Sequence, residues 1–471
     1  MQSIFDCPPV WHRAKVRGDF AARAHFTSIV AHDGACAAEV MVLFGGIGRH
    51  GLAEPALCEV EIILPVDREG RSVTLACRQP DARGLAPCAR SHHAATAVSG
   101  RRMLIAGGAD CHGHRLNDVH VLDLDFASGL RTWSTLEQVG TPPVALSSHS
   151  IVCLPGTHGL ASPAPRAAGA RSCAAVIVGR EGREGCVQPM QGGSSVRHGI
   201  EGCGAWRLRC TAPASGGATA EWQRCEVPSA TAAQRAGRSS VTLAARSGHS
   251  MIFTQQIPRC SADAKCTVGC EDGSDVSKRA HLRGALLVWG GRKSGGIDRI
   301  DVFGDDGDKN GNVADESKLG AGSDDVGDCC DASAMDTAEF DLARRLHSIA
   351  STSTPSAAPS GRRYHSAIRL GRYMLVFGGQ RLGFGACSER HVSPELFALD
   401  TMRGAWVALP LNIASGGTST AHRMPRQLCR AGHGFVLSPR LASYRKGFGL
   451  IVIGGIATAD KLSSDCWLLQ F

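Results

Sequence analysis

The sequence predicts an all-β fold in which repeated four-stranded sheets close into a ring. Six histidines along the 471-residue chain each open a short apolar run, and Gly-Gly pairs end the following apolar run in five of the six copies. A tryptophan occupies the last expected strand in four copies. A block that recurs in this order is typical of a repeat architecture.

The best copy, residues 90–136, contains the four expected strands in order. An apolar run after His92 ends at Val98, and a second run, residues 103–106, is wholly apolar, which indicates a strand buried on both faces. Residues 116–124 alternate between apolar and polar, and Trp133 lies in the fourth strand. The third copy is degenerate and carries Gly179 alone in place of the glycine pair.

The repeated residues are predicted to be structural. Because the histidines recur at equivalent positions, we expect them to pack and hydrogen-bond within each sheet. Five arginines lie two or three residues before a histidine (Arg23, Arg90, Arg246, Arg363 and Arg430), and we expect them to bond backbone carbonyls between sheets. Glycine pairs allow positive φ and close backbone approach, and tryptophan suits the interface between sheets. The predicted structural residues are His25, His92, His149, His249, His365, His433, Gly45, Gly46, Gly107, Gly108, Gly290, Gly291, Gly378, Gly379, Gly454, Gly455, Trp11, Trp133, Trp222 and Trp406.

This order of arginine, histidine, apolar strand, Gly-Gly, alternating strand and tryptophan resembles the kelch repeat. Each kelch unit is a four-stranded blade, so the resemblance implies a six-bladed kelch-type β-propeller over the whole chain, residues 1–471. The blades are expected at about 23–80, 88–138, 147–227, 246–347, 362–411 and 430–471. Residues 10–16 are expected to supply the last strand of the sixth blade, because such closure removes exposed sheet edges.

Long insertions are predicted in the third and fourth blades, because the histidine spacing there exceeds one repeat. The largest insertion, 304–361, is acidic and is expected to be mostly disordered. Within it, residues 339–342 are predicted as the fourth strand of blade four, with Phe340 in place of tryptophan. Deletion of 305–360 is therefore expected to leave the propeller folded. The insertions are expected to crowd one face and leave the other for docking.

Composition favours a reduced intracellular protein. The chain has a net charge of +8 and 20 scattered cysteines, and its first residues lack the apolar core of a secretion signal. We expect a cytoplasmic location, with the nucleus as the alternative, and a monomeric ring. No run of 18 apolar residues predicts a membrane span. The basic residues are dispersed, so direct nucleic-acid binding is not expected.

The open face is predicted to carry a basic rim, formed by the loops between the second and third strands. The rim is hypothesised to bind a protein partner through an acidic or phosphorylated segment, because arginine forks suit carboxylates and phosphates. An ordinary solvated surface is the alternative interpretation. The residues of the basic rim are Arg49, His50, His112, Arg115, Arg292, Lys293, Arg381, Arg390 and His391.

The predicted function is a non-catalytic protein-interaction platform or adaptor, with no catalytic residue, cofactor or metal. Kelch domains also occur beside tRNA-modifying methyltransferases, so an accessory subunit of an RNA-modifying complex is the alternative. A galactose-oxidase-like or metal-assisted enzyme is less favoured, because the chain has only three tyrosines, Tyr364, Tyr373 and Tyr444. Residues 306–313 match part of an EF-hand loop but lack its final glutamate, and Cys260, Cys266 and Cys270 lack zinc-site spacing.

Overall fold

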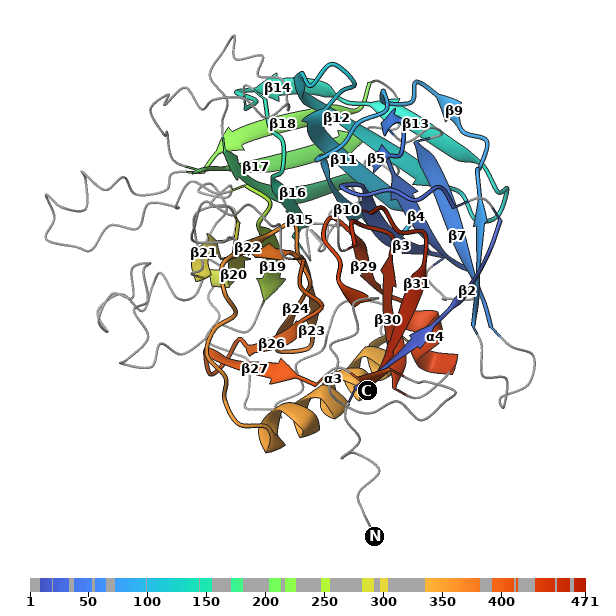
Figure 1. The fold of residues 1–471 in the computed structure, drawn as a ribbon. Helices are drawn as coiled ribbons and strands as arrows, with labels where there is room; N and C mark the ends of the chain where they lie inside the picture. Colours follow the sequence, from blue (N-terminus) through green and yellow to red (C-terminus); the bar gives the residue numbers. More distant parts are fainter. Residues whose placement is uncertain are drawn as a thin grey trace, which may run out of the picture.

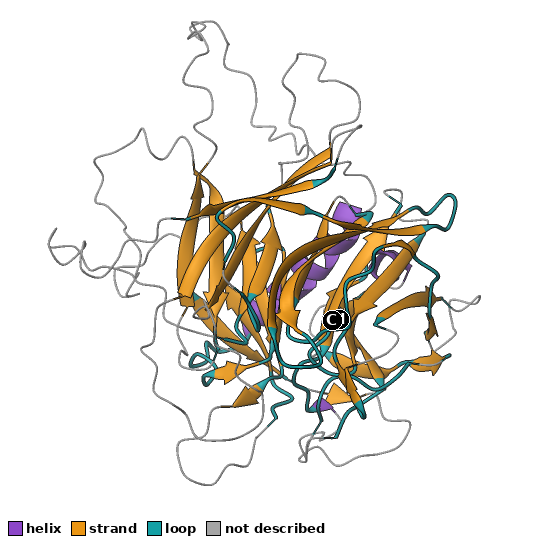
Figure 2. Ribbon diagram, turned by 90° about the horizontal axis from the view of Figure 1, so that it is seen from above, coloured by secondary structure: helices purple, strands orange, loops and turns teal. Residues whose placement is uncertain are grey.

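The computed structural model describes residues 9–18, 20–33, 38–52, 56–64, 73–98, 100–143, 145–154, 171–180, 203–212, 217–225, 247–254, 282–291, 297–303, 335–381, 392–410, 412–413, 428–444, 447–457 and 461–471. Strands form nearly all of the described elements, and they are arranged as radial sheets around a common centre (Figures 1 and 2). The prediction of an all-β propeller is therefore confirmed.

The sheets follow one another in chain order and are numbered here from 1 to 6. Sheet 1 contains β3 (Thr27–His32), β4 (Glu39–Phe44), β7 (Leu57–Ile63), β8 (Thr74–Arg78) and β2 (Lys15–Arg17). Sheet 2 contains β10 (Ala94–Val98), β11 (Arg102–Ala109), β12 (Arg115–Leu124), β13 (Arg131–Thr135) and β9 (Arg83–Gly84). Sheet 3 contains β15 (Ser150–Cys153), β16 (Arg171–Arg180), β17 (Cys203–Ala212), β18 (Thr219–Arg224) and β14 (Glu137–Gly140).

Sheet 4 contains β19 (Ser250–Thr254), β20 (Leu282–Trp289) and β21 (Ile297–Phe303). Sheet 5 contains β23 (Ser366–Leu370), β24 (Tyr373–Phe377), β26 (Leu396–Asp400) and β27 (Ala405–Leu409). Sheet 6 contains β29 (Gly434–Leu437), β30 (Phe448–Ile453), β31 (Cys466–Gln470), β1 (Val10–Arg13) and β28 (Asn412–Ile413). Short ribbons in the loops pair β5 (Ile47–Gly48) with β6 (Gly51–Leu52) and β22 (Arg362–Arg363) with β25 (Gln380–Arg381).

The expectation of six four-stranded blades is confirmed only in part, because five sheets have four or five strands each. Sheet 4 has three strands among the described residues. In sheets 1, 2, 3 and 6 the fifth strand, which the sequence did not reveal, runs parallel to the outermost strand. Each of these short strands covers a row of backbone groups that the outer edge would otherwise expose.

The hydrophobic core lies between the sheets, because each strand presents apolar side chains to both neighbours. Val178 of sheet 3 packs in one cluster with Val288 of sheet 4, and Leu287 of sheet 4 packs with Met374 of sheet 5. Similar clusters join every other successive pair, including sheets 6 and 1. The ring is therefore held by a continuous series of interfaces rather than by one central core.

Closure of the ring uses residues 10–13 of the predicted N-terminal strand 10–16, whereas residues 15–17 form β2 in sheet 1. Strand β1 pairs antiparallel with β31, with Trp11 opposite Leu469. The side chain of Trp11 is fully buried, and its ring centroid lies 5.0 Å from that of Phe377 in sheet 5. One strand from near the start of the chain thus completes the last sheet and seals its interface with sheet 5.

The predicted strand at residues 339–342 is wrong, because these residues lie in helix α3 (Met335–Thr352). Leu342, Leu346 and Ile349 recur at helical spacing and are buried against sheets 5 and 6, whereas Phe340 is 66% exposed. The part of the acidic insertion at 335–361 is therefore ordered, and 304–334 lies outside the described residues. Deletion of 305–360 would remove core residues, which reverses the earlier expectation.

Helix α3 packs against helix α4 (Pro439–Tyr444) on the face where the first and second strands of sheets 5 and 6 are joined (Figure 1). The Nδ1 atom of His347 lies 2.6 Å from the Tyr373 hydroxyl, and Arg345 donates to the Phe471 carbonyl at 3.4 Å. Neither described helix is long and apolar enough to cross a membrane. The two helices cover one face of sheets 5 and 6, and the opposite face contains the candidate site. The other predicted insertions lie almost wholly outside the described residues.

Candidate partner-binding site at the centre of the ring

Six residues, one just before the first strand of each sheet, form a closed ring of backbone hydrogen bonds around the central axis. Each N–H donates to the carbonyl of the equivalent residue in the preceding sheet, at N···O distances of 2.8–3.0 Å. The N–H of His25 donates to Gly432 and closes the circle. This arrangement, called the hub ring below, consists of His25, His92, Ser148, Gly248, Tyr364 and Gly432.

All members of the hub ring have left-handed backbones, with φ between 54° and 67°. Four of them, His25, His92, Ser148 and Tyr364, carry side chains, and they are the non-glycine residues with positive φ in the described part of the chain. This conformation costs about 1–2 kcal/mol per non-glycine residue. Strained backbones of this kind cluster at functional sites, where the surrounding structure holds them.

A cavity of about 150 Å³ lies at the hub ring and is lined by its side chains and by the residues that follow them. The rings of His25 and His92 stack with centroids 4.2 Å apart, and the edge of Tyr364 packs on His25 at 4.5 Å. The guanidinium carbon of Arg363 lies 5.0 Å from the centre of the Tyr364 ring. The cavity, called the hub cavity below, thus combines aromatic surface with a nearby fixed cation.

The repeat histidines form a second circle, one residue further along the chain. A Cβ atom built at Gly108 would lie 2.8 Å from Cβ of His93, and one built at Gly379 would lie 2.8 Å from Cβ of His365. Gly46 has the same relation to Phe26, so phenylalanine replaces histidine in sheet 1. The predicted structural residues His25 and His92 therefore belong to the hub ring instead. The circle itself consists of Phe26, His93, His149, His249, His365 and His433.

With this correction the repeat spacing is uniform, and the repeat arginine of sheet 5 is Arg362 instead of the predicted Arg363. The buried arginine of sheet 5 is Arg362, with 0% exposure, and Arg363 is the partly exposed residue at the hub cavity. Each repeat arginine then precedes its histidine or phenylalanine by three residues, and Leu146 takes the arginine position in sheet 3. Two adjacent histidines in sheet 2 and two adjacent arginines in sheet 5 made the sequence alignment ambiguous. Arg246 lies outside the described residues.

The predicted roles of arginine and histidine are exchanged in the structure. Arginine acts within its own sheet: Arg90 donates to the Gly107 carbonyl at 3.0 Å and forms an ion pair with Asp118. Arg362 makes the equivalent contacts with the Gly378 carbonyl, at 3.1 Å, and with Glu395. The histidines act between sheets, in two ways.

In the first, a hydroxyl of the preceding sheet meets the histidine ring: Thr27 Oγ1 lies 2.7 Å from Nε2 of His93, and Ser250 Oγ lies 2.6 Å from Nε2 of His365. In the second, the hydroxyl donates to the histidine carbonyl, as Ser150 does to His249 at 2.8 Å. Burial lowers the pKa of His149 to about 4 and that of His433 to about 3. These two rings are therefore neutral at physiological pH and serve as packing groups between the sheets.

The glycine pairs allow neighbouring sheets to approach closely at the same level. The N–H of Gly46 donates to the Arg90 carbonyl at 2.8 Å, and a Cβ at Gly45 would lie only 2.2 Å from that oxygen. Gly379 donates to Arg430 at 2.7 Å in the same way, and Gly455 donates to Arg23 across the closure. Gly108 and Gly291 repeat the contact with Leu146 and Arg362.

The predicted tryptophans lie on the outer strands, at the interfaces between sheets. Trp133, Trp222 and Trp406 each pair with a leucine of the third strand and are at most 5% exposed. The indole N–H of Trp222 donates to Gln138 at 3.0 Å, which satisfies the polar atom of that side chain. Their placement matches the structural role assigned to them.

The described part of the basic rim lies at the same end of the sheets as the hub cavity. Isolated bridges Ala24↔Ile47 and Ser91↔Ala109 hold the loops after the second strands beside the hub ring. Arg49, His50, His112, Arg115 and Arg381 are exposed, and Arg381 forms an ion pair with Glu395. Arg292, Lys293, Arg390 and His391 lie outside the described residues. Arg363 and Tyr364 were not predicted as site residues, because both occupy ordinary repeat positions in the sequence.

Within the described residues, no group of three or more His, Cys, Asp or Glu side chains could hold a metal ion. The EF-hand-like segment and the cysteine cluster at 260–270 lie outside those residues. The Tyr373 hydroxyl contacts His347 and Arg372 beneath helix α3, and Tyr364 lies at the hub cavity. The site of the described chain is therefore a cavity with hydrogen-bonding and aromatic groups.

Radial four-stranded sheets, a closed hub ring and glycine-lined interfaces define a β-propeller. A family model described as the KLHDC2/KLHL20/DRC7 Kelch-repeats domain matches residues 9–159. The same arginine, glycine and tryptophan contacts recur beyond that segment, which extends the likeness to the kelch-repeat family along the ring. Propellers of this family generally take part in protein–protein interactions.

Two curated relatives, both from Arabidopsis thaliana, match short segments. An acyl-CoA-binding domain-containing protein 5 is 39% identical over 67 residues, which cover 14% of this chain and 10% of that protein. The F-box/kelch-repeat protein At1g51550 is 32% identical over 122 residues, which cover 25% of this chain and 23% of that protein. The chain thus spans less than a quarter of the length of either relative. The solved structure of YjhT matches over 94% of both chains, with 10% identity and a TM-score of 0.41.

Proposed function

We propose that the protein is a non-catalytic docking platform that binds an acidic segment of a partner protein on the face with the hub cavity. The observation that carries this proposal is the cavity of about 150 Å³, which is lined by left-handed residues beside the cation of Arg363. The position of helices α3 and α4 on the opposite face also favours this assignment.

The electrostatics of the hub cavity favour an acidic ligand. Burial, together with the charge of Arg363, lowers the pKa of His92 to about 4, so this ring supplies hydrogen bonds and no charge at neutral pH. The fixed positive charges on this face are instead arginines, Arg363 beside the cavity and Arg49 and Arg115 further out. A carboxylate or phosphate beside a guanidinium gains short, charge-assisted hydrogen bonds.

We also propose that sheet 4 is one of six blades. The hub ring supports this count, because it takes one residue from each of six repeats and Gly248 comes from the fourth. The apolar clusters support it as well, since sheet 4 has its own interface with sheet 3 and with sheet 5.

The test is affinity purification of the full chain from its own cells. Two variants of the hub-cavity face are compared with wild type. Arg49→Glu/Arg363→Glu reverses charge, and Tyr364→Asn removes the aromatic ring while asparagine still accepts a left-handed backbone. The control is Arg369→Glu/Arg403→Glu, because both residues are exposed and lie away from the hub cavity, Arg369 near the end of β23 and Arg403 in the turn between β26 and β27.

We expect a stoichiometric protein partner that both variants of the hub-cavity face lose and the control retains. A partner that follows the control pair instead would place docking on the opposite face and overturn the proposal. Recovery of a methyltransferase subunit together with tRNA would favour the accessory role in an RNA-modifying complex.

A further inference from the structure

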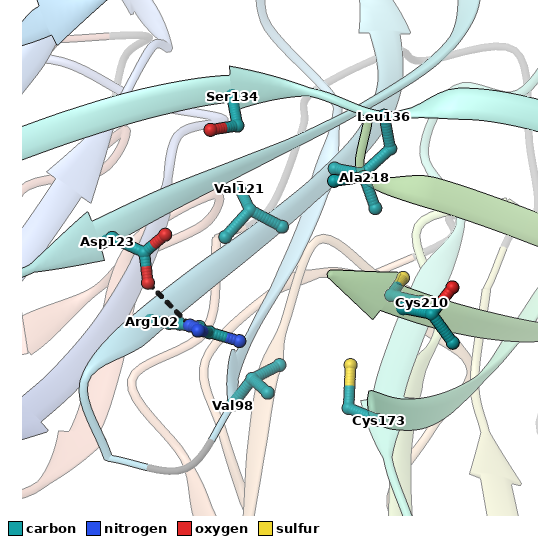
Figure 3. A pocket seen from close by; sticks show the side chains of 10 residues that line it. Val98, Arg102, Val121, Asp123, Ser134, Leu136, Cys173, Cys210 and Ala218 are labelled. Atoms are coloured by element: carbon teal, nitrogen blue, oxygen red, sulfur yellow. Dashed lines mark hydrogen bonds and ion pairs between the residues drawn. The ribbon is translucent and has the colours of Figure 1, made fainter. Parts of the chain in front are cut away.

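A second cavity, of about 50 Å³, lies between sheets 2 and 3 and is lined by two thiols (Figure 3). Cys173 of β16 and Cys210 of β17 form one wall, and the ion pair of Arg102 with Asp123 lies across from them in sheet 2. Both cysteines are free, and they are 7% and 5% exposed. The remaining lining is mainly apolar, from Val98, Val121, Leu136 and Ala218.

The two cysteines are positioned for a disulfide. They are direct partners in the antiparallel register of β16 and β17, so their side chains project from the same face of sheet 3. Directly opposite residues have Cα atoms about 4.5–5.5 Å apart, within the range of about 4.4–6.8 Å that disulfides require. The thiols also share a hydrogen bond. A bond between the sulfur atoms therefore needs little movement of the backbone.

The surroundings favour a thiolate on Cys173. The hydrogen bond from Cys210 and the charge of Arg102 lower the pKa of Cys173 against the opposing effect of burial. The same hydrogen bond and burial raise the pKa of Cys210, which keeps its proton. An attacking thiolate next to a protonated neighbour is the usual arrangement of a reactive and a resolving cysteine.

We propose that Cys173 and Cys210 are an oxidation site that converts to a disulfide when a peroxide enters the cavity. In the first step the Cys173 thiolate attacks one oxygen of hydrogen peroxide, the O–O bond breaks, and hydroxide leaves, which gives a sulfenic acid. In the second step Cys210 loses its proton, attacks the Cys173 sulfur and displaces a second hydroxide. Overall, two thiols and one peroxide give one disulfide and two waters.

The strand register distinguishes this pair from a second pair of neighbouring thiols, which serves as the control pair below. Cys58 and Cys77 also share a hydrogen bond and lie near an arginine, Arg23, in the interface between sheets 6 and 1. Cys77 is opposite Val60 in the register, so Cys58 and Cys77 are diagonal and not direct partners. We therefore expect Cys173 and Cys210 to oxidise first.

The test uses the reduced full chain, treated with graded hydrogen peroxide, alkylated with N-ethylmaleimide and mapped by peptide mass spectrometry. We expect a Cys173–Cys210 disulfide to form while Cys58 and Cys77 are still alkylated. In Cys210→Ser, dimedone should label Cys173, because the sulfenic acid has no resolving thiol. In Cys173→Ser, we expect no dimedone label at Cys210, because that thiol keeps its proton.

The role of Arg102 is tested with Arg102→Gln and the charge-conserving control Arg102→Lys. Each unit of increase in the Cys173 pKa lowers its thiolate fraction about tenfold and raises its nucleophilicity about threefold, so oxidation should slow about threefold. The lysine variant should keep most of the wild-type rate. The proposal is overturned if wild-type Cys173 and Cys210 remain alkylated while exposed Cys88 and Cys111 oxidise, or if the control pair reacts equally fast.

Discussion

A buried ion pair joins sheet 1 to sheet 2. Glu59 is fully buried and accepts hydrogen bonds from Arg131 of sheet 2 and from Arg78 of its own sheet, the latter at 2.7 Å. The side chain of Arg131 is only 4% exposed; it also donates to the carbonyls of Asp125 and Leu130, and Glu59 supplies the opposite charge. Removal of one partner from such a pair leaves the other charge buried and uncompensated.

Replacing Glu59 with alanine is therefore expected to destabilise the protein by about 3–5 kcal/mol. The measurement is the free energy of unfolding from urea denaturation at pH 7. Glu61→Ala is the matched control, because Glu61 lies on the same strand but is exposed, and it should change stability by less than about 0.5 kcal/mol. Equal effects of the two substitutions would mean that the buried pair contributes nothing specific.

At single positions, the sequence predicted which residue types repeat better than what each one does. The glycine and tryptophan positions follow from spacing alone, because only one alignment of those residues fits the copies that carry them. His25 and Arg363 were misassigned because an adjacent residue, Phe26 or Arg362, holds the repeat position. Adjacent residues such as these differ in the direction of their side chains, and the periodicity of a short segment does not show that direction.

Among the elements, helix α3 departs most from the prediction. Its apolar residues recur at helical spacing over 18 residues, whereas the prediction considered a four-residue window around Phe340. The acidic composition of the preceding segment also suggested that nothing nearby would pack. The short parallel fifth strands were missed for a different reason: two to four residues carry too little pattern to distinguish a strand from a loop.

We predict that Leu346→Ala lowers the free energy of unfolding by about 2–5 kcal/mol, since Leu346 is fully buried against sheets 5 and 6. Phe340→Ala on the same helix should have little effect, because its side chain is 66% exposed. Thermal or urea unfolding of both variants provides the comparison. If Phe340→Ala were the more destabilising change, the orientation of α3 against the ring would be wrong.

Over the whole molecule, repetition and closure were predictable, because both depend on segments with a strong pattern. The N-terminal segment carries Trp11 in a strand-like run, and the last repeat lacks a fourth strand. The hub ring was not predictable, since backbone hydrogen bonds between residues tens of positions apart leave no compositional trace. The hub cavity, which depends on that ring, therefore became visible only in the structure.

The buried histidines around the hub make the stability of the whole ring depend on pH. The pKa values of His92 and His149 are lowered to about 4 and that of His433 to about 3, mainly by burial. An unfolded chain binds protons at these residues below about pH 6.5, whereas the folded chain does not. Their contribution is complete above pH 6.5 and is lost progressively as the pH falls toward the folded-state values.

Between pH 7 and pH 5, each such histidine is expected to lower the free energy of unfolding by about 2 kcal/mol. Urea denaturation at the two pH values measures the loss, and His433→Gln should reduce it by one histidine's share. His112→Gln is the control, because His112 is exposed. A pH dependence unchanged in His433→Gln would exclude His433 as a source.

In the hub ring, backbone groups form the circle of hydrogen bonds, and side chains line the cavity where a ligand would bind. The hydrogen bonds of the hub ring use only the N–H and C=O groups of the six residues, so the side chains take no part in these bonds. Those side chains already differ: two imidazoles, a hydroxyl, a phenol and two hydrogens. Exchange among residues that accept a left-handed backbone would alter the chemistry of the cavity and leave the circle intact. Related chains could therefore acquire new ligands one position at a time, on an unchanged scaffold.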